Sequence, residues 1–299
     1  MLTRPTWIVV FLLIGLLFAG CRAESAPGQE AEPTVADTTQ ARFERVMDYA
    51  KEANLHERPI GEIMQVLGQQ FMEKPYLTGT LDEPATEQLV IRFDGFDCVT
   101  FVETVLAMAR GVAVQDYRFD TFARHLEDQR YRDGALDGYC SRLHYFTEWI
   151  DDNAARGTIR SLTADLGGVV LRDSVDFMST HRSAYPRFAT NDSLWACVRG
   201  MEARLQSRTI RYVPQDRIRA AYDRLEAGDI IGIATSIDGL DISHTGLVYE
   251  AQEGRIGLLH ASTSGGVKVS PDLQRYVQNI EHQIGILVAR PLTPHSTSQ

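Results

Sequence analysis

Apolar residues recur at helical spacing over the first half of the chain. Phe43, Val46, Met47 and Ala50 repeat at intervals of three and four, and residues 60–71 continue the pattern. A third apolar face follows position 98 and consists of Phe101, Val102, Val105, Leu106 and Ala109. These spacings predict three buried helices, the last ending at Gly111. Residues 138–150, "GYCSRLHYFTEWI", predict a further helix with Tyr139, Leu143, Phe146 and Ile150 inward.

Between the helices the periodicity breaks. "KPYLTGTLD" contains Pro75 and Gly79, and the alternation in "QLVIRF", residues 88–93, predicts a short extended piece before position 98. The last third predicts strands at "GDIIGIATSI", "HTGLVYEA", "RIGLLHAS" and "GVKVS". Helices followed by a meandering antiparallel sheet indicate an α+β fold, with the helices packed on one side of the sheet. Because no internal boundary is visible, residues 41–299 are expected to form one domain.

The only long apolar run lies at the amino end, in "WIVVFLLIGLLFAG", residues 7–20. It is short for a membrane span and typical of a signal peptide core. Phe18-Ala19-Gly20-Cys21 resembles the lipobox of bacterial lipoproteins, which predicts a signal peptide over residues 1–20 and a lipid on Cys21. The alternative is an ordinary secretory signal cut elsewhere. Residues 21–40 are small, polar and acidic, and predict a flexible tether.

The amino-acid composition and net charge limit the kinds of molecule that the protein could bind. With 44% hydrophobic and 23% charged residues the chain is globular, and its net charge of -10 argues against nucleic acid or an anionic membrane face as a partner. After Cys21, an odd number of cysteines remains in an oxidising compartment: Cys98, Cys140 and Cys197. Cys140 and Cys197 could form a disulfide, but each neighbours hydrophobic helix positions, so we expect two separate buried thiols.

Cys98 lies where a helix is predicted to begin. Asp97 could cap that helix by accepting from the N–H groups of Val99 or Thr100, and Thr100 with Glu103 forms a rival capping box. Either assignment leaves Cys98 near the positive end of the helix dipole, which favours a nucleophilic thiolate. The alternative is a buried structural cysteine.

A base for this thiol must come from far along the chain. Most histidines, including His56, His125, His282 and His295, lie in polar or terminal surroundings. His244 and His260 lie on two predicted strands joined around "QEG". A two-residue turn would place them on opposite faces, whereas a three-residue loop at 252–254 pairs Gly246 with His260 and places both on one face. We favour the loop, with Gly254 left-handed. His244 is then the general base, and His260 orients its ring.

These residues resemble the NlpC-type cysteine hydrolases of bacterial cell walls, a papain-like superfamily. "PYLTG", "FDC", "GDII", "SHTGLVY" and "LLHAS" match its landmarks in order across residues 75–262. A narrower resemblance is to its N-acetylmuramoyl-L-alanine amidase branch, through "PYLTGTL", "FDCVTFVE", "YCSRLHYF" and "FMSTHRSAYP". The resemblance implies a papain-like fold with the nucleophile at a helix N-terminus. It also implies hydrolysis of the amide between N-acetylmuramic acid, in ordinary or 1,6-anhydro form, and L-alanine.

Two other functions stay open. One is an endopeptidase cutting after D-glutamate, but Val99 and Thr100 stand where that branch carries Ser and Gly. The other is a wall-binding lipoprotein without turnover, which the presence of Cys98 and His244 disfavours. A zinc mechanism would need clustered ligands such as H-E-x-x-H, which the sequence lacks, so we expect no metal and no cofactor.

The resemblance also assigns roles. Cys98 attacks, and its backbone N–H holds the oxyanion with Tyr76. The other substrate-side candidates are Asp97, Arg142, His144, Tyr145, His181 and Tyr185. His144 is expected on the polar side of a helix and His181 in a loop, and the two tyrosines could equally be packing residues. The protein is expected to be a monomer that acts on peptidoglycan or muropeptides, lipid-anchored on the periplasmic side of the cell envelope.

Overall fold

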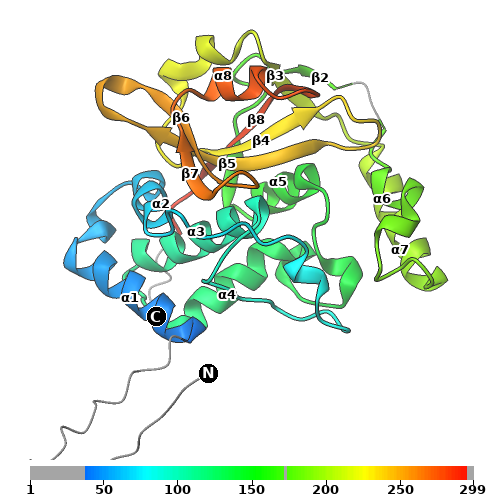
Figure 1. Ribbon diagram of the computed structural model, residues 1–299, viewed down its shortest axis with the longest axis horizontal. Helices are drawn as coiled ribbons and strands as arrows, with labels where there is room; N and C mark the ends of the chain where they lie inside the picture. The colour runs from blue at the N-terminus through cyan, green and yellow to red at the C-terminus, as the bar shows by residue number, and fades with distance from the viewer. Residues whose placement is uncertain (1–37, 172–173, 295–299) are drawn as a thin grey trace, which may run out of the picture. The chain divides into compact units, whose positions relative to one another are not determined.

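Thr38 caps the first described helix, since its hydroxyl accepts from the Ala41 N–H. A computed structural model describes residues 38–171 and 174–294 (Figure 1). The predicted signal peptide, Cys21 and nearly all of the tether lie outside these residues. Among the described helices, none is long and apolar enough to cross a membrane.

The helices that the apolar spacing predicts are present. They are α1 (Thr39–Glu52), α2 (Ile60–Gln69) and α3 (Cys98–Ala113), and α3 ends two residues beyond the expected Gly111. The remaining α-helices are α4 (Phe119–Arg130), α5 (Phe146–Ala155), α6 (Phe177–Thr180), α7 (Asp192–Leu205) and α8 (Leu273–Gln278). Short 3-10 helices are η1 (Leu55–Glu57), η2 (Thr80–Asp82), η3 (Arg132–Gly134), η4 (Tyr139–Ser141), η5 (Arg182–Ala184), η6 (Ile218–Arg224) and η7 (Gln252–Gly254).

One predicted helix is wrong in its first half. Over residues 138–150 the chain forms η4 and then runs extended through Arg142 and Tyr145, so α5 begins only at Phe146. His144 therefore lies in an extended segment and not on the polar side of a helix. Residues 88–93 carry no assigned strand, although they lead to position 98 as expected.

The strands form one antiparallel sheet. They are β1 (Ile159–Ser161), β2 (Val169–Val170), β3 (Arg211–Pro214), β4 (Ile230–Thr235), β5 (Ile242–Glu250), β6 (Ile256–Ser262), β7 (Gly266–Ser270) and β8 (Gln283–Pro291). Their order is β2-β3-β8-β4-β5-β6-β7, with β1 also on β8. β4 to β7 match the four predicted strands. β8 was not predicted, yet it lies in the middle of the sheet between β3 and β4.

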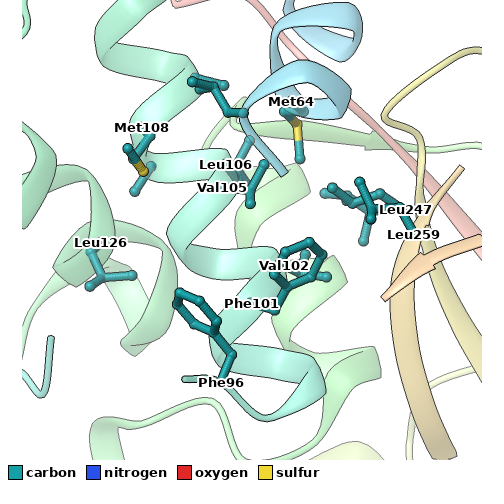
Figure 2. Close-up of a cluster of buried hydrophobic side chains, with 14 of the residues drawn as sticks. Met64, Phe96, Phe101, Val102, Val105, Leu106, Met108, Leu126, Leu247 and Leu259 are labelled. Atoms are coloured by element: carbon teal, nitrogen blue, oxygen red, sulfur yellow. The ribbon is translucent and has the colours of Figure 1, made fainter. Parts of the chain in front are cut away.

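Helices cover both faces of the sheet, so the expectation of one covered side was incomplete. The helices α1 to α5 lie on one face and α8 lies on the other (Figure 1). A first hydrophobic core lies between the sheet and the helices α1 to α5. In it, Leu247 of β5 and Leu259 of β6 pack with Val102 and Val105 of α3 (Figure 2). Val248 and Leu258, their neighbours in sequence, pack with Val277 of α8 in the second core. This alternation fixes which strand residues face α8.

A third core lies outside the sheet, under α6 and α7. Tyr139, Tyr145 and Phe188 pack there with Val198 and Met201. A disulfide joins Cys140 of η4 to Cys197 of α7, so our expectation of two separate thiols was wrong. The sequence pattern misled because Cys140 lies in η4, where its neighbours belong to this small core and not to a long helix. Cys98 is the free cysteine of the described chain.

Candidate functional site

The amino end of α3 holds Cys98 in place through its cap. Asp97 accepts from the Thr100 backbone N–H at 2.7 Å, and the Thr100 hydroxyl accepts from the Asp97 N–H at 3.0 Å. This reciprocal capping box makes Cys98 the first residue of the helix. The rival box is absent, because the buried Glu103 carboxylate binds Arg130 at 2.7 Å instead.

The hairpin of β5 and β6 has the register that places the two histidines together. Leu247 pairs with Leu259, and the ladder runs to Glu250 and Ile256 around the loop at 252–254. The three-residue loop is therefore confirmed, and both Glu253 and Gly254 have positive φ angles. A Cβ on Gly246 would lie 2.9 Å from the His260 Cβ. Glycine is therefore needed at position 246, directly opposite His260 on the neighbouring strand.

His244 and His260 form a direct contact on the α8 face of the sheet. His244 Nε2 lies 2.7 Å from His260 Nδ1. The second nitrogen of His260, Nε2, lies 3.1 Å from the Ser270 hydroxyl of β7. His260 is fully buried, whereas His244 keeps partial exposure. The ring of Tyr276, from α8, packs against both imidazoles, with centroids 4.8 Å from His260 and 6.0 Å from His244.

Cys98 and His244 line the same pocket, which has a volume of about 160 Å³. Its wall is largely apolar and also includes Val99, Leu143, His144, Phe146, Trp149, Leu240, Asp241, Ile242 and Ser243. The pocket thus joins the start of α3, the extended segment before α5 and the start of β5. A substrate in it would contact the thiol and the imidazole together.

Burial controls the protonation of this site. It raises the pKa of the Cys98 thiol to about 12, with the Asp97 carboxylate adding to the effect, while hydrogen bonds from the Thr245 backbone N–H and the Tyr76 hydroxyl oppose it. Burial also lowers the pKa of His244 to about 4. It lowers the pKa of His260 to about 3, helped by His244 and Lys268. The resting site therefore holds a neutral thiol and neutral rings at neutral pH.

Tyr76 lies next to Cys98, the residue that the family resemblance expects it to assist. Its strand-like bridge to Phe96 brings it beside the start of α3. Burial raises the pKa of Tyr76 above its usual value, and the nearby Cys98 and Asp97 raise it further. The hydroxyl thus stays protonated and is available as a donor.

Two of the other substrate-side candidates lie near this pocket or behind it. His144 lines the pocket, and its Nε2 lies 2.8 Å from the Tyr139 carbonyl. Burial lowers the pKa of His144 well below its usual value. Arg142 is buried, hydrogen-bonded to Asp82, 3.3 Å from Glu87 and packed over Tyr139. Its charge is satisfied within the protein.

The remaining candidates lie in the core under α6 and α7 or on its surface. Tyr145 is buried, and its hydroxyl donates to Glu202 at 2.8 Å and accepts from the Met178 N–H. Tyr185 stacks on Phe188 at 5.1 Å. His181 is exposed and stacks on Phe177. None of the three lines the pocket of Cys98 and His244.

Sequence reasoning missed three polar contributors. Ser270 and Tyr276 meet the histidines, and Asp241 lines the pocket while accepting from the N–H and hydroxyl of Thr147. A signal for Ser270 was available, since it ends the predicted strand that pairs with the His260 strand. Tyr276 had none, because six-residue α8 carries no long apolar period.

Comparisons with known proteins found a matching family model and several similar solved structures. A family model described as AmiA-like, N-acetylmuramoyl-L-alanine amidase-like, matches residues 66–286. A solved N-acetylmuramoyl-L-alanine amidase from Bacteroides uniformis is 33% identical, with a TM-score of 0.73 over 78% of this chain and 99% of its own. A candidate xylanase from Bacteroides fragilis is 35% identical, with a TM-score of 0.69 over 75% of this chain and 98% of its own.

A more distant structure, protein LPG0564 from Legionella pneumophila, matches the family model DUF1460. It is 20% identical, with a TM-score of 0.63 over 86% of this chain and 98% of its own, and it supports the fold alone. No curated protein matches the chain.

Proposed function

Because the chain belongs to the N-acetylmuramoyl-L-alanine amidase-like family, we propose that it is a cysteine amidase of the bacterial cell wall. Its substrates are peptidoglycan fragments, including those with 1,6-anhydro sugars, and it cuts between the lactyl group of N-acetylmuramic acid and L-alanine. The observation that carries this proposal is the pocket shared by Cys98 and His244. The contact of His244 with His260 adds the orienting group that such a base needs.

The same arrangement supports membership of the NlpC-type papain-like superfamily. A cysteine begins a helix, and two histidines lie on neighbouring antiparallel strands packed against that helix. This is the arrangement expected for a thiol activated by an imidazole that comes from a distant part of the chain.

The proposed reaction is acyl transfer through Cys98. His244 takes the thiol proton while sulfur bonds to the lactyl carbonyl carbon. The negative charge on oxygen is held by the Cys98 backbone N–H and the Tyr76 hydroxyl. The tetrahedral intermediate expels the L-alanine amine, which receives the proton from His244. Water, deprotonated by His244, then attacks the thioester, and the returning proton restores the thiol.

The pocket does not favour cleavage of a glycosidic bond. That chemistry uses two carboxyl groups flanking the scissile bond. Asp241 is the carboxylate that lines the described pocket with Cys98, and its Oδ2 already accepts two hydrogen bonds from Thr147. A thiol paired with an imidazole instead suits an amide.

Product identification tests the proposal. Purified protein is given a disaccharide-tetrapeptide in ordinary and 1,6-anhydro forms, and the products are identified by mass spectrometry. We expect a free L-alanine amine and an intact disaccharide bearing a lactyl carboxylate. A new amine on the diamino acid would instead establish the endopeptidase activity. If neither substrate gives a product, the remaining alternative is an inactive wall-binding lipoprotein.

We also propose that the protein is exported and lipid-anchored through Cys21, on the periplasmic side of the envelope. The apolar run at 7–20 followed by Cys21 supports this placement. The Cys21→Ser variant should move from the membrane fraction to the soluble fraction, whereas Cys98→Ser should remain membrane-bound. Equal fractionation of both variants would contradict lipidation at Cys21.

A further inference from the structure

We infer that Ser270 and Tyr276 are positioning residues for the histidine pair. Ser270 decides which nitrogen of each ring carries the proton, and Tyr276 keeps water away from the hydrogen bond between the rings. The catalytic consequence rests on the proposed function, but the inference itself concerns only the protonation of His244 and His260.

The hydrogen bonds connect the serine hydroxyl to the proposed base. A neutral imidazole has one N–H donor and one acceptor nitrogen. When the Ser270 hydroxyl oxygen accepts from His260 Nε2–H, His260 Nδ1 is an acceptor. That nitrogen then accepts from His244 Nε2–H across the 2.7 Å contact. His244 Nδ1 is left with a lone pair, which is what a base for the thiol requires.

The opposite direction would disable the base. When Ser270 donates, His260 carries its proton on Nδ1 and donates it to His244 Nε2. His244 must then hold its own proton on Nδ1, and it cannot accept the proton of Cys98. The direction of the Ser270–His260 hydrogen bond therefore distinguishes a competent from an incompetent pair of tautomers, and the proposed role of Ser270 is to accept.

The sheet explains why Ser270 fills this position. His260 pairs directly with Lys268, and Leu258 pairs with Ser270, so Ser270 is the diagonal neighbour of His260 on β7. The Lys268 ammonium forms its hydrogen bonds elsewhere, since it donates to the Ser264 carbonyl at 2.7 Å and to the Ser264 hydroxyl at 2.9 Å. The serine hydroxyl is thus left to contact the His260 ring.

Tyr276 is held over the two rings by the packing of α8. Leu273 and Val277 of this helix are fully buried against the sheet. The Tyr222 hydroxyl accepts from the Gln274 N–H at 2.8 Å and lies 3.2 Å from Asp272, which caps α8. The Tyr276 ring consequently meets His260 at 65° and covers the side of the pair that faces α8.

The charged and titratable groups around His244 and His260 determine how removal of the Tyr276 ring would change the pKa values of these two histidines. His260 faces His244, Lys268 and Tyr276, while His244 shares its pocket with Cys98. Burial raises the pKa of Tyr276 to about 12, with Cys98 adding to the effect, so its hydroxyl is neutral. The ring therefore acts by excluding water, and water entering in its place would favour protonated imidazoles.

The test is histidine nitrogen NMR of the full-length protein labelled with ¹⁵N-histidine. Signals are assigned with the His244→Asn and His260→Asn variants. At pH 7.5 we expect both rings to carry the proton on Nε2. In Ser270→Ala a substantial fraction should move to the Nδ1–H tautomers. Ser262→Ala is the matched control, because this buried serine on β6 contacts Ser264 and neither ring.

The same spectra, followed with pH, test Tyr276. Tyr276→Leu should raise the pKa of at least one of the two rings by about one unit, whereas Tyr276→Phe keeps the ring and should leave the titration unchanged. Wild-type Nδ1–H tautomers, or an unchanged distribution in Ser270→Ala, would overturn the role of the serine. Identical titrations for the leucine and phenylalanine variants would overturn that of the tyrosine.

Hydrolysis data separate this inference from the proposed function. With muropeptide as substrate, Ser270→Ala should lower kcat and leave KM nearly unchanged. If the protein cleaves no muropeptide, the tautomers and titrations can still be measured, so the proposed function can fail while the inference stands.

Discussion

At the scale of single residues, burial decides how the proposed nucleophile and base begin the reaction. The pKa of the Cys98 thiol is raised to about 12 and that of His244 is lowered to about 4, both chiefly by loss of water. The two groups therefore rest as a neutral pair and not as thiolate and imidazolium. Proton transfer to His244 must then accompany attack on the carbonyl.

This resting state predicts slow alkylation of Cys98. At pH 7 a thiol with a pKa near 12 is ionised roughly a thousandfold less than a free cysteine. The rate of modification by iodoacetamide should be correspondingly low and should rise with pH beyond pH 9. It is measured by mass spectrometry of the Cys98 peptide between pH 5 and 10. Rapid alkylation that is independent of pH between 5 and 8 would reveal a preformed ion pair and contradict this description.

At the scale of elements, the cap of α3 links stability to thiol chemistry. Asp97→Ala removes the acceptor for the Thr100 N–H and should cost about 1 kcal/mol in the free energy of unfolding, measured with urea. Asp97→Asn keeps an oxygen acceptor and should stay within about 0.5 kcal/mol of wild type. Because the carboxylate raises the pKa of Cys98, both variants should be alkylated faster. Equal stability of Asp97→Ala and wild type would exclude the cap.

Elements with a strong local pattern could be predicted from the sequence. Strands β4 to β7 alternate or are continuously apolar between turn residues, and Gly254 suits the left-handed position that fixes the β5–β6 register. That register brought His244 and His260 to one face. The pairing of two side chains from neighbouring strands is a local matter, which a single sequence can specify.

Features that depend on distant segments were not accessible. Residues 138–150 have helical spacing, but the disulfide at Cys140 and the core around Tyr139 and Tyr145 hold their first half out of a helix. β8 pairs with β3 and β4, and the residues of β8 alone do not specify which strands it pairs with. Tyr276 reaches the histidines only because α8 packs on the second face of the sheet.

The disulfide predicts a separable contribution to stability. It closes a loop with a sequence separation of 57 residues and ties α7 to η4. The double variant Cys140→Ser/Cys197→Ser should lose about 2–4 kcal/mol of unfolding free energy, which urea denaturation would measure. Cys98→Ser serves as the control for loss of a thiol. No destabilisation relative to that control would show that the bond does not form in solution.

At the scale of the whole molecule, a sheet covered on both faces buries His260 of β6 and makes the fold sensitive to acid. His260 is fully buried with a pKa lowered to about 3, whereas an unfolded chain would protonate it near 6.5. The unfolded state therefore binds more protons below pH 6.5. Stability from this residue is present above that value and is lost as the pH falls toward 3.

Unfolding measurements at two pH values test this coupling. Between pH 7 and pH 5, His260 should account for a loss of about 2 kcal/mol in the free energy of unfolding. His260→Asn should lose less over the same interval by about that amount. The exposed His181→Asn is the matched control and should follow wild type. If His260→Asn and wild type lose the same free energy, the ring is not held neutral by the fold.

The central claim is that Cys98 carries the lactyl-sugar acyl group during turnover. Mass spectrometry of acid-quenched reactions with a defined disaccharide-peptide tests it most directly, in wild type and in Cys98→Ala. We predict a transient mass increase equal to the acyl group on the Cys98 peptide of wild type, and neither adduct nor product with Cys98→Ala. Product formation by Cys98→Ala at the wild-type rate would contradict the claim.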